Sequence, residues 1–293
     1  MIEALKPYPA YTDSQEPCLG VVPTHWDVKK LRQVGRLFKG VGGTKEDAVA
    51  EGVPCVRYGD LYTTHSYFIR TSRTYLTEER AREYMPMEYG DVLFAGSGET
   101  LDDIGKSAVN LLTGPARCGG DLIMLRPTMT LHAPFLGYAT DSRPSTAQKA
   151  AMGRGTTVKH IYPEQLKNLA ICLPPMNEQE SIVRILDHAD RRIQRYIRAK
   201  QKLIALLNEQ KQAIVHRAVT RGLDPNVRLK PSGVEWLGEV PEHWRVTSLK
   251  TVAEVQSGLT LGKIYISPEL VELPYLRVAN VQAGYLEILI RQT

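Results

Sequence analysis

The feature that most constrains this chain is an internal repeat. Residues 14–40 align without gaps with residues 232–258, which lie 218 positions later, and 11 of the 27 aligned positions are identical. The identities include a Pro-x-His-Trp motif at residues 23–26 and 241–244. This spacing is far longer than the period of roughly 20–50 residues that marks a solenoid. The sequence therefore predicts one domain, a spacer, and the start of the same domain again.

A second stretch of similarity extends the repeat. Residues 54–61 align with residues 274–281 and share a Pro, an Arg and an alternation of apolar residues. The first copy runs to about residue 175, whereas only 62 residues, 232–293, belong to the second. We therefore expect the second copy to be incomplete.

The tryptophans of the repeated motif are candidates for the core. Trp26 and Trp244 follow His25 and His243 in the two copies. Because an indole ring buries a large apolar area, each Trp is expected to anchor packing, with the His on the entry turn. The motif is therefore evidence about the fold and not about a catalytic site.

The first copy combines strand and helix patterns. Short apolar segments bounded by Gly, Pro and Asp predict strands at 54–58, 90–95, 107–112 and 121–126. Helices are predicted at 77–84, where Thr77 precedes two Glu residues, and at 134–140. The first copy is therefore expected to be a mixed α+β domain.

The spacer between the copies is predicted to be one long helix. Residues 177–221 contain neither Gly nor Pro, while Pro174 and Pro175 precede them and Gly222 follows. Asn177 with Glu180 three residues later fits an N-cap and capping box, and Gly222 suits a C-terminal stop. Such a helix has about 43 residues and measures roughly 65 Å at ~1.5 Å per residue.

Apolar residues follow the predicted helix in alternating steps of four and three, which is typical of a coiled coil. The stripe comprises Ile182, Leu186, Ala189, Ile193, Tyr196, Lys200, Leu203, Leu207, Gln210 and Ile214, with polar residues at two positions. We therefore expect a partner helix, contacted by Ile182, Leu186, Ile193, Leu203, Leu207 and Ile214.

The other face of the helix is basic. It carries Arg191, Arg192, Arg195, Arg198, Lys202, Lys211 and Arg217. Two interpretations stay open for these residues, a solvated face or contact with DNA backbone or an acidic protein. Only the second predicts binding that is sensitive to salt.

Composition indicates a water-soluble, cytoplasmic protein. No run of apolar residues is long enough for a spanning helix, and the first residues have no signal-peptide pattern. The four cysteines stand singly, without metal-ligand spacing, and are expected to be buried or incidental thiols. The net charge of +5 is compatible with a polyanionic partner but does not decide for one.

Three enzyme motifs can be weighed against these residues. Residues 105–107 end like a phosphate-binding loop, but Thr100 stands where that loop needs a Gly. Residues 173–176 lack the polar residue and the aromatic of an amino-methyltransferase motif. Glu164 and Lys167 have a nuclease-like spacing but no further carboxylate partner. We therefore predict no catalytic residue and no metal site.

Polar and Gly-rich loops remain, and they suit DNA. Gly lets backbone amides approach phosphates, while Arg, Lys, Ser and Thr donate to phosphates and base edges. Ordinary exposed turns have the same composition. The candidates for DNA contact are Lys39, Lys45, Arg57, Tyr58, His65, Ser97, Thr100, Arg154, Thr156 and Lys159.

Taken together, these motifs resemble the specificity subunits of type I restriction–modification systems. The resemblance rests on the Trp-Leu-Gly-Glu-Val-Pro-Glu-His-Trp segment at 236–244 with its weaker copy at 18–26, on residues 90–100 and 155–160, and on Leu-Pro-Pro-Met-Asn-Glu-Gln at 173–179 before a long helix. It spans nearly the whole chain. The combination of the duplicated segment with the Pro-Pro-x-x-Glu-Gln helix entry is fairly specific.

The resemblance implies a domain plan and a set of partners. An N-terminal tail (1–13) would precede a first target-recognition domain (14–176), a spacer helix (177–221) and the start of a second recognition domain (222–293). Each recognition domain would read one half of a split site in double-stranded DNA. The subunit itself would be non-catalytic and without a cofactor, and would recruit methyltransferase subunits that use S-adenosylmethionine and restriction subunits that use ATP and magnesium.

The chain departs from that family pattern at its end. A full member would complete the second domain and add a second helix that pairs with the first. The sequence is therefore expected to be C-terminally truncated, or to pair with itself through residues 177–221. Two other interpretations stay open, namely a stand-alone nuclease or methyltransferase with an unrecognised active site, and a coiled-coil scaffold without DNA affinity.

Overall fold

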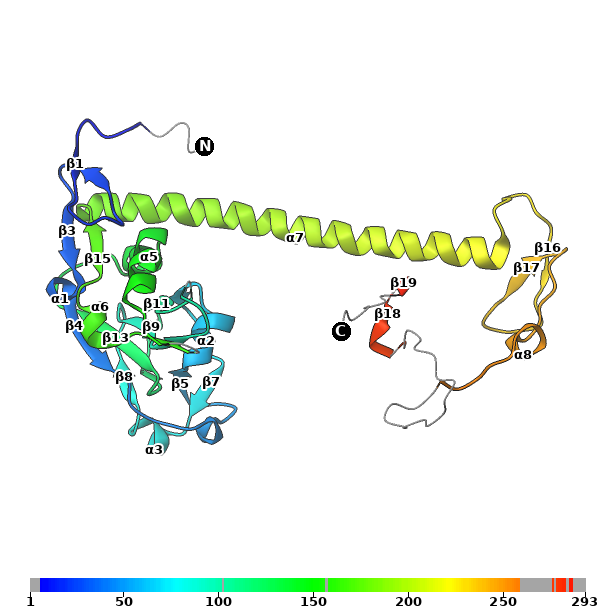
Figure 1. The fold of residues 1–293 in the computed structure, drawn as a ribbon, viewed down its shortest axis with the longest axis horizontal. Helices are drawn as coiled ribbons and strands as arrows, with labels where there is room; N and C mark the ends of the chain where they lie inside the picture. Colours follow the sequence, from blue (N-terminus) through cyan, green and yellow to red (C-terminus); the bar gives the residue numbers. More distant parts are fainter. Residues whose placement is uncertain are drawn as a thin grey trace, which may run out of the picture. The chain divides into compact units, whose positions relative to one another are not determined.

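The computed structural model describes residues 6–101, 103–155, 158–258, 276, 278–282 and 285–286. Two compact units make up the chain, Met1–Lys202 and Leu203–Thr293. The first unit mixes strands and helices, which confirms the α+β class expected from the sequence (Figure 1). None of the helices in the described residues is both long enough and apolar enough to span a membrane.

The strands of the first unit are short, and all of those in the described residues precede the long helix. They are β1 (Tyr11–Asp13), β2 (Val21–Pro23), β3 (Asp27–Lys30), β4 (Gly35–Lys39), β5 (Val53–Val56), β6 (Tyr67–Ile69), β7 (Thr74–Leu76), β8 (Met85–Met87), β9 (Val92–Ala95), β10 (Ser97–Gly98), β11 (Ser107–Asn110), β12 (Ala116–Cys118), β13 (Leu122–Pro127), β14 (Lys159–His160) and β15 (Ala170–Leu173).

The helices of the first unit are mostly one or two turns long. They are α1 (Leu31–Val34), the 3-10 helix η2 (Lys45–Asp47), α2 (Tyr58–Thr63), α3 (Glu78–Ala81), α4 (Ala133–Thr140), α5 (Arg143–Met152), α6 (Pro163–Leu166) and the long α7 (Met176–Arg221), which continues into the second unit.

A five-stranded sheet in the order β4-β13-β9-β11-β6 forms the centre of the first unit. All four residues of β9 are buried, because both faces of the sheet are covered. Val92 and Phe94 pack on one face with α4, β15 and the start of α7, and Leu93 and Ala95 pack on the other with residues of β5, α2 and β12. A four-stranded sheet in the order β7-β5-β12-β8 lies on this second side.

The sequence located the main strands but placed fewer helices. The segments predicted at 54–58, 90–95, 107–112 and 121–126 overlap β5, β9, β11 and β13 to within one residue at the ends of β5 and β13 that fall outside them. The helix predicted at 77–84 is the shorter α3, in which the Thr77 side chain accepts the N–H of Arg80 as expected for a cap. The helix predicted at 134–140 is α4. The sequence did not predict α1, α2, α5 or α6.

The long helix follows β15 directly, with only Pro174 and Pro175 between them. It has 46 residues, roughly 69 Å at ~1.5 Å per residue. It begins one residue earlier than predicted, so Asn177 lies inside the helix and the prediction of an Asn177 N-cap is wrong. The predicted stop is confirmed, since Gly222 follows the helix with a φ of +76°.

A cluster formed by Glu178, Tyr8, His25 and Trp26 attaches the first turn of α7 to the amino-terminal segment. The Glu178 carboxylate accepts hydrogen bonds from the Tyr8 hydroxyl (2.7 Å) and the Trp26 indole N–H (3.1 Å), and it pairs with the His25 Nε2 atom (2.7 Å). Trp26 is half-buried rather than inside the core, so the core prediction for it is wrong. Its indole N–H instead donates to Glu178, and the His-Trp motif of the first copy thereby attaches the first turn of α7.

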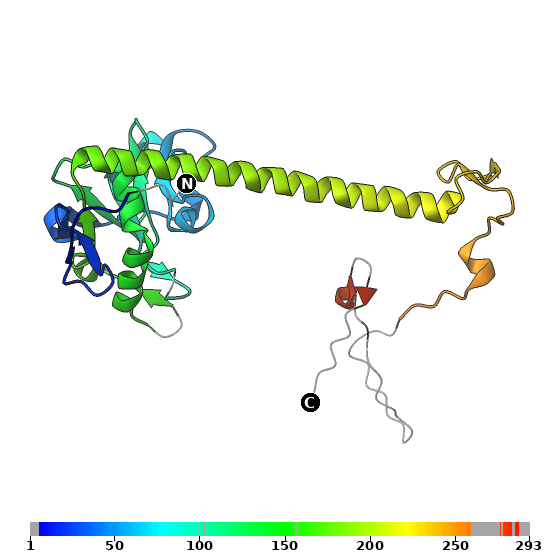
Figure 2. The same cartoon turned by 90° about the horizontal axis from the view of Figure 1, so that it is seen from above.

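Packing of the first turns of α7 on the domain adds to this attachment. Val183 is buried in the core, and the Tyr138 hydroxyl donates to Asp187 at 2.9 Å. The Gln179 side chain accepts the N–H of His132 and donates to the carbonyl of Pro174. Both ribbon views show these turns lying along the domain (Figures 1 and 2).

The second unit repeats the start of the first. It contains β16 (Leu229–Pro231), β17 (Glu239–Pro241), α8 (Leu249–Val252), the 3-10 helix η3 (Val278–Asn280), β18 (Val281–Gln282) and β19 (Tyr285–Leu286). Strand β16 pairs with β17 in the register of β1 with β2, each residue shifted by 218. Backbone hydrogen bonds repeat at the same shift. The backbone N–H of Trp26 donates to the carbonyl of Pro23 at 3.0 Å, and the backbone N–H of Trp244 donates to the carbonyl of Pro241 at 2.8 Å. The repeat seen in the sequence is therefore a repeat in structure.

Candidate nucleic-acid interface

Helix α2 presents a pair of tyrosines at the edge of the first unit. Its start is fixed by the Asp60 carboxylate, which accepts the N–H of Arg57 at 2.8 Å. The rings of Tyr58 and Tyr62 lie 5.2 Å apart on the same face of the helix. Burial is the main cause that raises the pKa of both hydroxyls, so both stay protonated and can donate hydrogen bonds.

Tyr62 connects α2 to the polar loop that follows β9. Its hydroxyl lies 2.7 Å from the carbonyl oxygen of Ser97 and 3.1 Å from that of Asp103. Within the loop, the Thr100 hydroxyl donates to the Asp103 carboxylate at 2.7 Å. These bonds bring the loop at 97–103 beside α2, although the two segments are far apart in sequence.

A hollow of about 200 Å³ opens beside this loop. The short antiparallel pair of β10 and β14 forms one wall, and there the Ser97 hydroxyl lies 3.0 Å from Nδ1 of His160. The exposed ring of Tyr162 stacks on His160 with centroids 6.3 Å apart. Exposed Lys39, at the end of β4, lies on the rim. A cation, a hydroxyl and a stacked aromatic pair around one hollow can bind phosphate and a base face.

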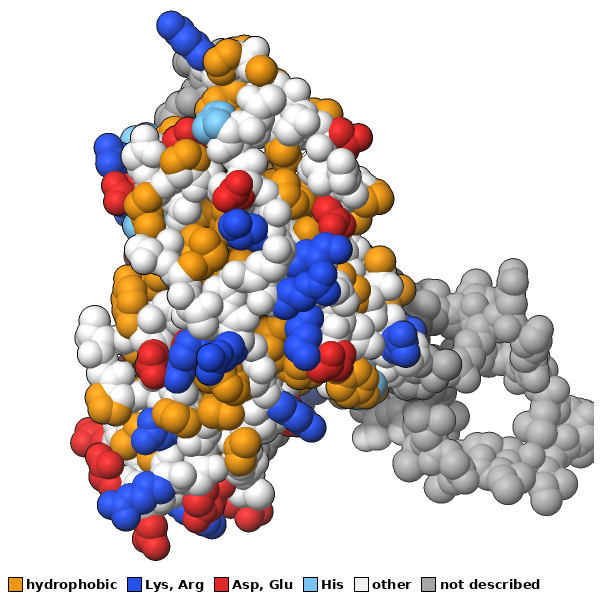
Figure 3. Space-filling view, turned by 90° about the vertical axis from the view of Figure 1, so that its left-hand side faces the viewer, with side chains coloured by type: hydrophobic (Ala, Val, Ile, Leu, Met, Phe, Trp, Pro, Cys, Tyr) orange, Lys and Arg blue, Asp and Glu red, His pale blue; other side chains and the backbone are white. Residues whose placement is uncertain are grey.

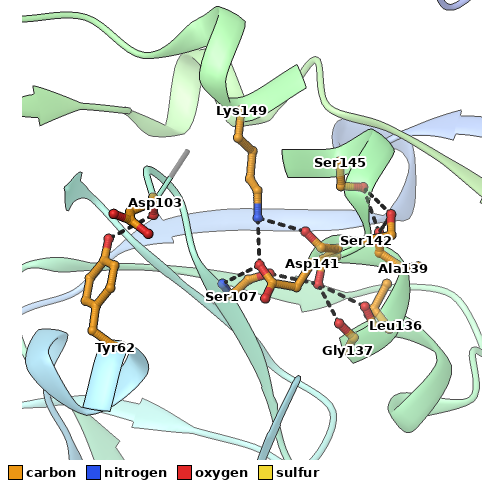
Figure 4. Close-up of polar contacts among 11 residues, drawn as sticks. Tyr62, Asp103, Ser107, Leu136, Gly137, Ala139, Asp141, Ser142, Ser145 and Lys149 are labelled. Atoms are coloured by element: carbon orange, nitrogen blue, oxygen red, sulfur yellow. Dashed lines mark hydrogen bonds and ion pairs between the residues drawn. The ribbon is translucent and has the colours of Figure 1, made fainter. Parts of the chain in front are cut away.

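A buried lysine supports the loop from behind (Figure 4). Lys149, which is fully buried on α5, donates to the carbonyl of Thr140 and to the Asp141 carboxylate, both at 3.0 Å. Burial lowers the pKa of the Lys149 ammonium, while Asp141 acts to raise it. Asp141 also accepts the N–H of Ser107 at 3.2 Å. The network fixes the chain where the loop returns to the sheet.

The same network explains the segment that ends like a phosphate-binding loop. Gly105 has a φ of +70°, and a Cβ atom there would lie 2.9 Å from Cδ of Lys149. Ser107 is fully buried in β11, and its hydroxyl lies 3.1 Å from that of Thr140. The Gly and the Ser of this segment therefore serve packing, and Ser107 is closed to a phosphate.

The structure gathers several of the predicted DNA contacts at this surface. Lys39 and Ser97 line the hollow, Thr100 lies in the adjacent loop, and Lys159 is in β14. Exposed Arg154 is joined to the same hairpin, because its backbone exchanges two hydrogen bonds with His160, of 2.9 and 2.7 Å. Thr156 lies outside the described residues.

Other predicted residues stand apart from the hollow. Arg57 is half-buried and donates to the carbonyl of Thr44 at 2.8 Å, so its guanidinium orders the Gly-rich loop at 40–44. Lys45 begins η2. His65 is only 5% exposed, and burial lowers its pKa. A buried, neutral His65 cannot reach DNA in this structure, so the prediction that His65 contacts DNA is not kept.

The sequence missed three aromatic residues of the surface, Tyr62, His160 and Tyr162. His160 and Tyr162 directly follow the basic segment at 153–159, and a ring next to basic residues is a signal of base stacking. No comparable signal marks Tyr62, since its role depends on a contact with residues 35 and 41 positions away.

Charges elsewhere on the first unit are mixed. Figure 3 looks onto the edge that carries β3, α1 and β4, where Lys and Arg side chains are interleaved with hydrophobic and acidic ones.

Burial raises the pKa of the Cys55 thiol to about 11 and that of Cys118 to about 12, so both thiols are protonated. In the described part of the chain, no group of three or more His, Cys, Asp or Glu side chains is arranged to hold a metal ion.

Comparison with known families decides the relationship. Residues 23–204 match the model of the type I restriction modification DNA specificity domain. The chain belongs to this family. The match covers the residues that line the hollow beside β10 and β14 and the part of α7 up to residue 204, and it confirms the resemblance that the repeated motif and the helix entry indicated.

Individual members of the family are similar over different stretches. The chain is 22% identical over 275 residues to the EcoKI type I restriction enzyme specificity subunit of Escherichia coli strain K12, covering 93% of this chain and 56% of that one. It is 34% identical over 105 residues to the MjaVIII specificity subunit of Methanocaldococcus jannaschii, covering 36% and 23%. The chain thus spans 56% of the length of the first of these relatives and 23% of the length of the second.

A solved structure shares the fold. A chain from a study of complex assembly and conformational transition in a type I restriction–modification system has a TM-score of 0.51 to this chain. It is 23% identical and covers 67% of this chain and 46% of its own length. Its likeness agrees with an α+β domain that leads into a long helix.

The long helix of this specificity-domain member exposes the stripe expected to contact a partner. Of the six predicted contact residues, only Ile182 packs on the core of the first unit. The other five are exposed: Leu186 38%, Ile193 55%, Leu203 47%, Leu207 53% and Ile214 61%. Other apolar residues beside the stripe are exposed too, including Ile197 at 42% and Ile204 at 60%. A surface of this kind marks a protein contact.

Proposed function

We propose that this chain is a DNA-reading specificity subunit of a type I restriction–modification complex, itself non-catalytic. The observation that carries the proposal is the family match over residues 23–204, which includes the hollow beside β10 and β14. In this proposal the first unit reads one half of a split site in double-stranded DNA. The complex acts in the cytoplasm.

The proposed reading surface has two parts with different roles. Lys39, Arg154 and Lys159 contact phosphates and set the register, while Ser97 and His160 reach base edges. Tyr58 and Tyr162 offer exposed or half-buried rings to a base or sugar. Lys45 and Thr156 remain candidates for DNA contact from the sequence alone. Arg57 and Thr100 contribute by ordering the loops.

Partner subunits supply the chemistry in this proposal. Methyltransferase subunits bring S-adenosylmethionine, and restriction subunits bring ATP and magnesium. Helix α7 acts as the spacer and contact element, because five of its six predicted contact residues are exposed. A second copy of this helix, from another specificity chain, is one further partner for the stripe.

The experiment is a selection on DNA with the assembled complex. The chain is co-expressed with the methyltransferase encoded beside its gene, and the purified complex is mixed with a random-sequence duplex library at physiological salt. Enrichment of a short sequence supports the proposal. A complex that forms but binds all duplexes equally, or a chain that binds neither partner, contradicts it.

Variants then test the surface itself. Arg154→Ala is expected to weaken binding to all duplexes and to reduce the slope of log affinity against log salt by about 1, as for one lost phosphate contact. Arg82→Ala is the matched control, because Arg82 is also exposed but lies at the end of α3. Equal effects of the two variants would remove the hollow from the reading surface.

A further inference from the structure

Helix α5 carries two neighbouring polar residues on its buried side, Gln148 and Lys149, and neither lines the hollow beside β10 and β14. Gln148 is 7% exposed and Lys149 is fully buried. The Gln148 amide donates to the carbonyl of Ala170 and accepts the N–H of the same residue, both at 2.9 Å. One side chain thus binds both backbone groups of a β15 residue, which attaches α5 to β15. Lys149 therefore extends from a fixed support.

The Lys149 ammonium joins α5 to the end of α4 and to the start of β11. Figure 4 shows its side chain pointing to Asp141. The Nζ atom donates to the carbonyl of Thr140 and to the Oδ1 atom of Asp141, both at 3.0 Å. The same Oδ1 atom accepts the N–H of Ser107 at 3.2 Å, so one carboxylate oxygen connects Lys149 to the point where the chain re-enters the sheet.

The methylenes of Lys149 contact the return limb of the loop at 97–103. Gly105 lies directly on them, because a Cβ atom there would be 2.9 Å from Cδ of Lys149. The next residue, Ile104, reaches the outgoing limb, because a Cβ atom on Gly98 would be 3.2 Å from the backbone N and Cα atoms of Ile104. A continuous path of close contacts therefore runs from Lys149 to the neighbour of Ser97.

The far end of this path is the proposed base-reading group. Ser97 and Gly98 form β10, which pairs with β14, and the Ser97 hydroxyl lies 3.0 Å from Nδ1 of His160. A shift of Gly105 or Ile104 would therefore displace the Ser97 hydroxyl from His160. Lys39, a proposed phosphate contact, lies on β4 and outside the path.

The charge of Lys149 contributes geometry more than stability. Burial lowers the pKa of its ammonium, because the charged form loses its hydration. A buried ion pair is often no more stabilising than apolar residues of the same volume, so stability alone does not explain it. Two acceptors at 3.0 Å fix the Nζ atom, and with it the methylenes under Gly105, in one position. An apolar side chain of the same length has no such directional contacts.

We propose that Lys149 is a positioning residue for sequence discrimination. It keeps the loop at 97–103 in the position that places the Ser97 hydroxyl beside His160, and it does not contact DNA itself, because it is fully buried. The inference rests on the proposed function. It names a residue outside the reading surface on which the selectivity of that surface depends, while the affinity for DNA of any sequence does not.

The experiment measures binding by the full chain in complex with the methyltransferase. Two duplexes are compared by fluorescence anisotropy, the one enriched by the selection and one of the same composition with shuffled sequence. For Lys149→Met, which keeps the length but removes the ammonium, we expect the ratio of the two affinities to fall about tenfold, the size of one lost base contact. The affinity for the shuffled duplex and its salt dependence should stay unchanged, because the phosphate contacts remain.

Arg126→Met is the matched control. Arg126 binds the buried carboxylate of Asp91 at 2.7 Å, next to the end of β9 that is opposite to the loop. This variant also removes the partner of a charged group in the same sheet, but it should leave the affinity ratio unchanged. The inference is overturned if Lys149→Met weakens binding to both duplexes by the same factor, or if the two variants lower the ratio equally.

Gly105→Ala tests the same path with the ion pair in place, and it covers the case in which Lys149→Met does not fold. Its Cβ atom meets a side chain that is fixed at both ends, so the loop shifts and the ratio is expected to fall as well. In the Lys149→Met background the same substitution should lower the ratio less, because the two residues are in contact.

Three further outcomes are decisive. Independent effects of the two substitutions would overturn the inference, because the loop would then not be positioned through Lys149. A wild-type preference for the enriched duplex that both variants retain would overturn this inference alone. A wild-type complex without any preference would overturn the proposed function, and this inference with it.

Discussion

Residues 11–34 and 229–252 form the same hairpin and short helix, yet Leu31 and Val34 of the first helix are fully buried, whereas Leu249 and Val252 of the second are largely exposed. The hairpin needs only neighbours in sequence, because its turn, register and closing bonds repeat at a shift of 218. The burial of Leu31 and Val34 needs residues much further along the chain, because the core cluster that holds them includes residues of β9, β13, α4, α6 and β15. Local structure and core packing are thus separable in this protein.

Truncation of the two leucines tests this separation most strongly. Leu31→Ala is expected to lower the free energy of unfolding of the first unit by about 2–5 kcal/mol, since Leu31 is fully buried. Leu249→Ala should change stability by less than about 0.5 kcal/mol, as at other exposed sites. Urea unfolding followed by circular dichroism measures both. Equal losses would mean that Leu249 is covered in solution.

Loss of the carboxylate at the base of α7 should have the next largest effect. Glu178→Gln is expected to destabilise the first unit by about 1–2 kcal/mol, because three donors lose a charged acceptor. Glu180→Gln is the matched control two residues away, on an exposed position of the same helix. A loss confined to Glu178→Gln would attribute the effect to the cluster and not to helix charge.

The tryptophans give a smaller contrast between the copies. Trp26→Phe keeps most of the ring but removes the N–H that donates to Glu178, so we expect a loss of about 0.5–1.5 kcal/mol. Trp244→Phe removes an N–H without an acceptor in the described residues and should cost less than about 0.5 kcal/mol. Thermal unfolding of the two variants decides between this contrast and equal roles for the two rings.

The smallest effect concerns pH. Burial alone would raise the pKa of Glu178, but hydrogen bonds from Tyr8, His25 and Trp26 lower it below its ordinary value of 4.5. A lowered folded pKa contributes stability above about pH 4.5 that is lost as the pH falls through the folded value. The gap in unfolding free energy between wild type and Glu178→Gln should therefore narrow from about pH 6 to about pH 3. If the difference in unfolding free energy stayed constant over this range, it would contradict an ionised Glu178 in the folded protein.

The sequence predicted best what depends on near neighbours. The repeat, the long helix and strands such as β9 and β13 were expected because apolar runs, turn residues and an absence of Gly and Pro are local signals. Helix α5 was missed because its inward face carries Gln148 and Lys149, which are buried but polar, so no apolar period marks it. Asn177 was assigned as a cap although the helix starts one residue before it.

The candidate site was predictable by residue type more than by position. Lys39, Ser97 and Lys159 were chosen as polar loop residues, and the structure brings them to one edge through the pairing of β10 with β14. His65 has the same character in sequence, but it is buried after α2. The Ser97–His160 contact joins residues 63 positions apart. The burial of His65 also depends on tertiary packing, which no local pattern encodes.

Helix α7 has no hinge at its amino-terminal end. The sheet strand β15 passes into it through Pro174 and Pro175, whose backbone torsions are restricted, and Glu178 is held from the side by two separate segments. A twist or pull applied to the start of the helix is therefore transmitted to β15 and to its partner strand β3, instead of being absorbed by a linker. The first unit and the start of α7 therefore turn together, so torque on the start of the helix also turns the hollow beside β10 and β14.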